Sequence, residues 1–213
     1  MILILGIPSE PPVAMLADAL ERAGCEFTMV NQREFLDHRL DVTIRNGRPQ
    51  GSLTMEGRRI DIDDISAVYV RLSDHRVLPE RDGLPDDDPR AVHIDRLHER
   101  WIRLLDVLPA VVVNRLGAMA SNSSKPYQTE LINRVGLDTP TTLVTSDPDA
   151  ARHFIEQHRD VGGVIFKSVS GVRSIVRRMS EEDADRLDLL VRCPTQFQAF
   201  VPGDDVRVHV VGD

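Results

Sequence analysis

Short apolar segments alternate with amphipathic segments along the whole chain, and this alternation constrains the fold more than any other feature of the sequence. Residues 2–5 are continuously apolar, as in a strand that is covered on both faces. Apolar residues between 13 and 23 recur at helical spacing, and another strand-like segment follows at 27–30. The β-α-β opening and the continued alternation behind it predict an α/β fold.

The region from residue 41 to residue 106 is expected to contain a hairpin, a loop and a long helix. Asn46-Gly47 is a turn dipeptide between two strand-like segments, which predicts the hairpin. Residues 73–88 are rich in proline, glycine and aspartate, and we interpret them as a solvated, mobile loop rather than a metal site. A helix is predicted over 90–106. Its two histidines, His93 and His98, are spaced five apart, which does not suit a zinc site, so solvated positions are expected for both.

The second half of the chain begins after a small, polar segment at 117–126, GAMASNSSKP, which is the predicted domain boundary. After this boundary, apolar segments again alternate with amphipathic segments. The last predicted strand, at 206–211, has no neighbouring strand, so the chain is expected to be cut within a domain. Helices are predicted at 127–135, 147–158 and from 180, and strands at 142–144, 164–166, 175–177, 196–201 and 206–211.

Composition excludes several classes of protein. The 213 residues are enough to bury a core. No run of about 18 apolar residues is present, so no membrane span is expected. The net charge of −8 argues against general nucleic-acid binding. The two cysteines are far apart, which excludes a disulfide framework and indicates a reducing, cytoplasmic setting.

Two lysines are candidates for binding an anion. Lys167 stands at the exit of an apolar strand, before the small-residue loop SVSGVRS, where it can place a positive charge beside phosphate-binding amides. There is no Walker motif, and a lysine beside an ordinary loop is the competing interpretation. Lys125 lies at the mouth of a helix, where a cation opposes the helix dipole. A bound anion would explain it, and a solvent-facing side chain is the alternative.

The third candidate is the segment QFQAFVPGDDVRVHVV, at residues 196–211. Its apolar edge can hold a heterocycle through main-chain hydrogen bonds, with Asp204 or Asp205 near ribose hydroxyls and Arg207 near phosphate. A β-hairpin with a polar turn is the plain alternative.

Taken together, these pieces resemble the ATP-grasp superfamily, especially the RimK-like branch with its glutathione-synthetase and peptide-maturase relatives. The resemblance rests on SNSSKPYQ, GLDTPTTLVTSDP, VIFKSVSG and FQAFVPGDDVRVHVVGD. It implies an N-terminal α/β domain of the pre-ATP-grasp type at 1–116, followed by an incomplete ATP-grasp core. That core would comprise a small lid subdomain at 117–190 and the start of the C-terminal core subdomain at 191–213.

The resemblance also implies an activity, that of an ATP-dependent carboxylate–amine ligase with an acyl-phosphate intermediate. ATP and Mg²⁺ would be required, and the substrate would be a peptide or an amino acid. Phosphoryl transfer of this kind depends on positioning and on charge neutralisation. The implied site consists of nucleotide-binding residues Lys125, Lys167, Ser168, Ser170, Gly171, Gln198, Phe200, Val201 and Asp205, the catalytic residue Arg207, and the substrate-binding residues Arg71 and Arg173.

Three departures from the family pattern bear on this interpretation. The flap has one glycine, Gly171, and Ala199 stands where relatives often carry an acidic residue. The family's magnesium ligands lie on later strands, so they are expected beyond residue 213, and the chain alone is expected to be inactive. The alternative hypothesis is therefore a non-catalytic relative that binds a nucleotide or a peptide. Neither a nucleic-acid nor a membrane partner is expected, and the apolar edge strand at 206–211 favours a homodimer.

Overall fold

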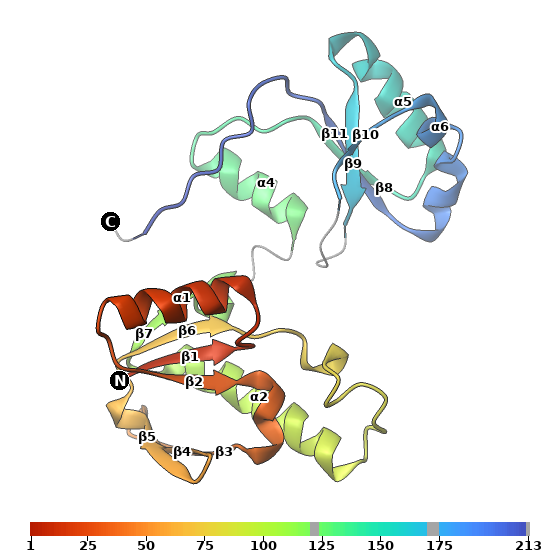
Figure 1. Ribbon diagram of the computed structural model, residues 1–213. Helices are drawn as coiled ribbons and strands as arrows, with labels where there is room; N and C mark the ends of the chain where they lie inside the picture. Colours follow the sequence, from red (N-terminus) through yellow and green to blue (C-terminus); the bar gives the residue numbers. More distant parts are fainter. Residues whose placement is uncertain (120–123, 170–174, 212–213) are drawn as a thin grey trace. The chain divides into compact units, whose positions relative to one another are not determined.

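The computed structural model describes residues 1–119, 124–169 and 175–211. The chain divides into two compact units, residues 1–119 and 120–213 (Figure 1). Both combine helices with sheets, so the predicted α/β class is confirmed. None of the helices that the structure describes is long and apolar enough to cross a membrane.

A parallel four-stranded sheet organises the first unit. Its strand order is β2-β1-β6-β7. Helix α1 (Pro11–Arg22) connects β1 to β2, which confirms the predicted β-α-β opening. Glu10 precedes the helix, and Val13 is its one fully buried residue. The strands are β1 (Ile2–Gly6), β2 (Phe27–Asn31), β6 (Ala67–Arg71) and β7 (Val111–Val113).

A small antiparallel sheet and helix α2 (Pro89–Val107) complete the first unit. Strands β3 (Arg39–Arg45), β4 (Arg48–Met55) and β5 (Arg58–Asp61) pair in that order. Asn46 and Gly47 both have positive φ, as the predicted hairpin turn requires. The core contains Trp101, which is fully buried. Short helical turns lie at η1 (Gln32–Asp37), η2 (Ile62–Asp64), η3 (His75–Val77) and α3 (Leu116–Met119).

The acidic segment before α2 makes specific contacts. Asp88 caps α2 by accepting a hydrogen bond from the amide of Arg90. Arg81 is buried and pairs with Asp86 and with Asp95. These contacts explain two of the aspartates as structural residues.

The two histidines of α2 correct a prediction. His93 Nε2 lies 3.0 Å from the carbonyl oxygen of Phe35, and His98 stacks on His75 with ring centroids 4.1 Å apart. Both rings are only partly exposed, so the expectation of solvated positions is wrong. The five-residue spacing excludes a shared helix face, but it does not show which neighbouring segments cover each ring.

The second unit contains an antiparallel sheet with the order β10-β9-β11-β8. One face carries the core, which is formed with α5, α6 and η6 (Figure 1). The strands are β8 (Thr142–Thr145), β9 (Val164–Ser168), β10 (Arg177–Arg178) and β11 (Thr195–Ala199). The helices and helical turns are α4 (Lys125–Arg134), α5 (Pro148–His158), η5 (Arg159–Val161), α6 (Glu181–Ala184) and η6 (Leu187–Arg192).

Helix starts in the second unit follow the sequence signals. Ser124 caps α4, Asp147 caps α5, and Ser180 forms a capping box with Asp183 at α6. Strand β11, which the sequence analysis places in a separate subdomain, lies inside this sheet between β9 and β8.

The predicted strand at 206–211 is not formed. Residues 200–211 contain neither helix nor strand, and the side chains of Val206, Val208 and Val210 are more than three-quarters exposed. A strand needs a partner for its backbone hydrogen bonds, and none of the described strands pairs with this segment. The alternating pattern alone therefore does not order it.

Candidate functional site

Lys167 lies on the face of the second sheet that is opposite to the core. Strand residues alternate between faces, and cross-strand partners share a face. Phe197 pairs with Phe166 and belongs to the core, whereas Gln196 pairs with Lys167 and Gln198 pairs with Ile165. The structure thus brings the predicted nucleotide-binding residues Lys167 and Gln198 to one face. We name this the lysine face. It is formed by Thr142, Val144, Ile165, Lys167, Gln196 and Gln198.

Gln198 is held in place on the lysine face by β8. Its Nε2 donates to Thr142 Oγ1 at 3.0 Å, and that hydroxyl donates to the carbonyl oxygen of Pro140 at 2.9 Å. The side chain is buried. The short hydrogen-bonded series fixes the amide orientation before any ligand arrives.

Phe200 extends the lysine face beyond the end of β11. Its amide donates to the carbonyl oxygen of Gly163 at 2.9 Å, so that donor is already used within the protein. The guanidinium carbon of Arg178 lies 4.5 Å from the centre of the Phe200 ring, a cation–π contact. Sequence reasoning missed Arg178. In the register of β10, Arg178 pairs with Ile165 on the lysine face, and Arg177 pairs with Phe166 on the core face. Only this register shows which of the two adjacent arginines lies on the lysine face.

The other predicted residues of the second unit fall into three groups. Ser168 pairs with Thr195, so its side chain belongs to the core face rather than the lysine face. Val201, Asp205 and Arg207 lie in the exposed segment 201–211, and the structure does not bring them onto a strand. Ser170, Gly171, Arg173 and the side chain of Lys125 lie outside the described residues.

Arg71 belongs to the first unit and forms an ion pair there. Its Nε donates to Glu10 at 2.7 Å, and Ser73 Oγ donates to the second oxygen of the same carboxylate at 2.9 Å. These residues lie at the carboxyl ends of β1 and β6. From β1 the chain continues to β2 at one edge of the sheet, and from β6 it continues to β7 at the other edge. Open α/β sheets bind ligands at such a topological switch point.

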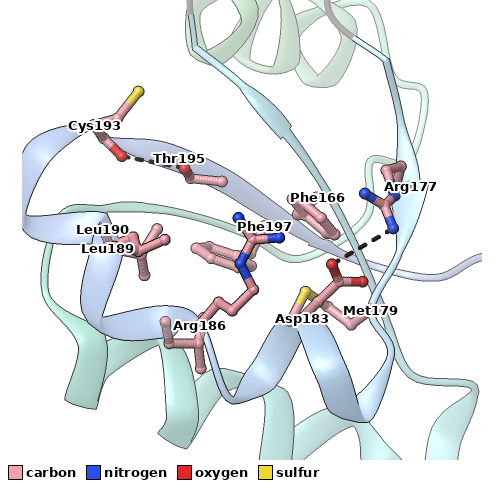
Figure 2. A pocket seen from close by; sticks show the side chains of 11 residues that line it. Phe166, Arg177, Met179, Asp183, Arg186, Leu189, Leu190, Cys193, Thr195 and Phe197 are labelled. Carbon is pink, nitrogen blue, oxygen red and sulfur yellow. Dashed lines mark hydrogen bonds and ion pairs between the residues drawn. The ribbon is translucent and has the colours of Figure 1, made fainter.

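A cavity of about 310 Å³ lies on the core face of the second unit (Figure 2). Its rim carries Arg177 and Asp183, which point towards each other with 3.6 Å between nitrogen and oxygen. The hydrogen bond from Ser180, and then the charges of Arg177 and Arg186, lower the pKa of Asp183. The apolar walls come from Phe166, Met179, Leu187, Leu189, Leu190 and Phe197.

The described residues do not include a cluster of metal-binding side chains. No group of three or more histidine, cysteine, aspartate or glutamate side chains there is arranged to hold a metal ion. The chain segments that the structure describes therefore do not themselves form the magnesium site that the resemblance implies.

Lysine is rare in this protein, and both lysines are predicted phosphate-binding residues. Only two of the 26 basic side chains are lysines, and these are Lys125 and Lys167. The other basic side chains are all arginines. A lysine ammonium is a compact point charge, which suits contact with a single phosphate oxygen, whereas the guanidinium of arginine is a planar fork.

Comparison with known proteins identifies similar structures. No protein-family model matches the chain, and no curated protein matches it. The macrocyclase MdnC from Microcystis aeruginosa MRC, bound with precursor peptide MdnA, has a TM-score of 0.74 and 20% identity, covering 95% of this chain and 66% of MdnC. A RiPP-associated ATP-grasp ligase from Chryseobacterium gregarium, in complex with ADP and a leader and core peptide, has a TM-score of 0.73 and 23% identity, covering 93% and 62%.

The ATP-grasp ligase PsnB, complexed with minimal precursor, Mg and ADP, has a TM-score of 0.71 and 26% identity, covering 95% of this chain and 64% of PsnB. The chain thus spans less than two thirds of the length of each of these three proteins. It has a partial ATP-grasp fold, and its predicted resemblance to the ATP-grasp ligases of the peptide-maturase kind is confirmed.

Proposed function

We propose that this chain is the nucleotide-binding part of an ATP-dependent carboxylate–amine ligase that acts on a peptide. The lysine face supports this proposal, because Lys167 and Gln198 lie on the same face of a sheet that is packed on its other face. A sheet face that combines cationic side chains with buried amides suits a nucleotide, which has an apolar base at one end and phosphates at the other.

In the proposed reaction, a carboxylate oxygen of the substrate attacks the γ-phosphorus of ATP, and ADP leaves. An amine then attacks the acyl carbon, inorganic phosphate leaves, and the amine nitrogen loses a proton. The role of Lys167 is to hold the phosphates and offset their negative charge during the first step. Gln198, which Thr142 orients, together with the main chain of residues 199–201, is the proposed contact for the base.

A magnesium ion, when bound, would neutralise charge between the phosphates. No group of three or more histidine, cysteine, aspartate or glutamate side chains among the described residues is arranged to hold it. The roles proposed here for Lys167 and Gln198 do not depend on the metal.

The proposed partner is a peptide, and two observations support it. The matched structures contain a precursor peptide, a leader and core peptide, or a minimal precursor. The cavity in Figure 2 has apolar walls and a rim of Arg177, Asp183 and Arg186, which suits an apolar side chain flanked by charged groups of a peptide.

In the first unit, we propose that Arg71 binds a substrate carboxylate. Such binding would compete with its ion pair to Glu10. The position at the carboxyl ends of β1 and β6 supports this role.

A non-catalytic, nucleotide-binding or peptide-binding protein is the second candidate. It is favoured by the exposure of Asp205 and Arg207, which do not lie on a strand. Formation of ADP that depends on an added peptide would distinguish the ligase from this alternative.

The small number of lysines provides a direct test. Reductive ¹³C-methylation of the 213-residue chain labels Lys125, Lys167 and the N-terminal amine, which gives three sets of NMR signals. Addition of ATP is expected to shift the Lys167 signal, which the Lys167→Met variant identifies by its absence.

The same variant should weaken ATP binding at least ten-fold, since it removes a charge-assisted contact. Arg134→Met removes an exposed cation that pairs with Glu130 and serves as the control, with ATP affinity unchanged. Equal ATP affinity of the Lys167→Met variant and the wild type would refute the proposed site.

A further inference from the structure

Two of the buried glutamines, Gln32 and Gln196, have amides with opposite surroundings. Gln32, in the first unit, is 2% exposed. Its Nε2 donates to the carbonyl oxygen of Ser73 at 2.8 Å, and its Oε1 accepts from the Ser73 amide at 2.9 Å. Gln196, in the centre of the second sheet, is 1% exposed, and neither atom of its amide has a hydrogen-bond partner.

An amide buried without partners destabilises a fold. It loses its hydrogen bonds to water and gains none in exchange, whereas leucine or methionine of similar size would gain from the same burial. Packing therefore explains Gln32, whose hydrogen bonds join two segments of the first unit, but it does not explain Gln196. A polar group kept in such a position indicates a partner that arrives with a ligand.

The position of Gln196 identifies that partner. It pairs in register with Lys167 on β9, at the end of the strand that leads into the small-residue loop. Gln198, two residues further along the same face, lies towards the proposed base contacts at residues 199–201. Gln196 therefore lies at the phosphate end of the proposed nucleotide site.

The chemistry of the three groups is complementary. A lysine ammonium can only donate hydrogen bonds, and a phosphate oxygen can only accept them. A carboxamide does both, so it can join a lysine to a phosphate. We propose that Gln196 binds the nucleotide phosphates together with Lys167: its Oε1 accepts from the ammonium of Lys167, and its Nε2 donates to a phosphate oxygen. This inference rests on the proposed nucleotide site and adds to it a residue that the sequence motifs did not indicate.

The first test is stability without ligand. Hydrogen exchange of the β9 and β11 amides in the Gln196→Met variant should be as slow as in the wild type or slower, because an amide without partners has been replaced by an apolar group. The matched control, Gln32→Met, breaks the bonds to Ser73 and should lower the urea midpoint of the first unit. If Gln196→Met instead accelerates exchange across both strands, the amide has a structural role and the inference is wrong.

The second test is ligand binding, measured by calorimetry with ATP and with adenosine. Gln196→Met should weaken ATP binding about ten-fold and leave adenosine binding unchanged, because the lost contact is to phosphate. Gln196→Glu retains the acceptor for Lys167 but places a negative charge beside the phosphates, and it should bind ATP at least as weakly. The effects of Gln196→Met and Lys167→Met should be non-additive, as expected for groups in contact.

The possible failures are distinguishable. If the wild-type chain does not bind ATP, the proposed function fails and the inference fails with it. If the wild type binds ATP and Gln196→Met binds it equally well, or loses adenosine affinity to the same extent, the nucleotide site stands and the role of Gln196 is refuted.

Discussion

Mild acid should destabilise the first unit through His98. Burial, and then the electrostatic interaction with the neighbouring His75, lowers the pKa of His98 from 6.5 to about 4. The contacts are consistent with a neutral ring, since Gln32 Nε2 lies 3.5 Å from His98 Nδ1 and can donate only to an unprotonated nitrogen. The folded chain therefore excludes a proton that the unfolded chain binds.

The direction and size of the effect follow from this difference in pKa. Above pH 6.5 the ring is neutral in both states, and its contribution to stability is fully present. As the pH falls from 6.5 towards 4, only the unfolded chain takes up the proton, and stability is lost. A pKa that falls from 6.5 to about 4 corresponds to about 3 kcal/mol at most. Since the ring is partly exposed to solvent, we expect about 1–2 kcal/mol.

The assay uses the single tryptophan of the chain. Trp101 is fully buried on the same helix as His98, so its fluorescence reports unfolding of the first unit. Urea midpoints measured between pH 7 and pH 4.5 should fall in the wild type and fall less in His98→Leu. His153→Leu, which changes an exposed histidine of α5 in the second unit, is the control. Identical pH dependence of the wild type and His98→Leu would refute this explanation.

Two further substitutions test the fold and the cavity. Gly51→Ala should destabilise the first unit by about 2 kcal/mol or more in the Trp101 assay, because φ is +149° there and a Cβ atom would lie 1.9 Å from the carbonyl oxygen of Asp41. Gly47→Ala, where a Cβ atom meets nothing within 4 Å, should have a smaller effect, and equal losses would contradict the steric argument. Leu189→Asp places a charge in the cavity wall. Peptides selected from a random display library on the wild-type chain should bind this variant at least ten-fold more weakly, and unchanged binding would exclude the cavity as the peptide site.

Local patterns predicted the local elements well. The hairpin at Asn46-Gly47, helix α2 and the helix that starts after Ser180 each depend on residues close together in the chain, and each is present in the structure. Periodicity also identified the strands that lie inside a sheet. It failed at residues 206–211, because alternation describes a strand's two faces but not whether a partner strand is present to pair with it.

The site was only partly predictable, for a different reason. Lys167 could be predicted as a candidate phosphate-binding residue because it stands where an apolar strand meets a loop of small residues. Gln196 and Arg178 could not, because their significance depends on cross-strand register and on burial, which arise from contacts between distant segments. His98 was misassigned for the same reason, since the ring that covers it comes from a separate helical turn, η3.

The strand order of the second sheet has a consequence for synthesis on the ribosome. Strand β8 pairs with β11 and with none of the other described strands, and β9 pairs with β10 and β11. Although β11 is the last of the described strands to be translated, it occupies an interior position. The nascent chain must therefore hold β8 unpaired while about 50 further residues emerge, and the lysine face, with Lys167 beside Gln196, exists only once β11 has inserted.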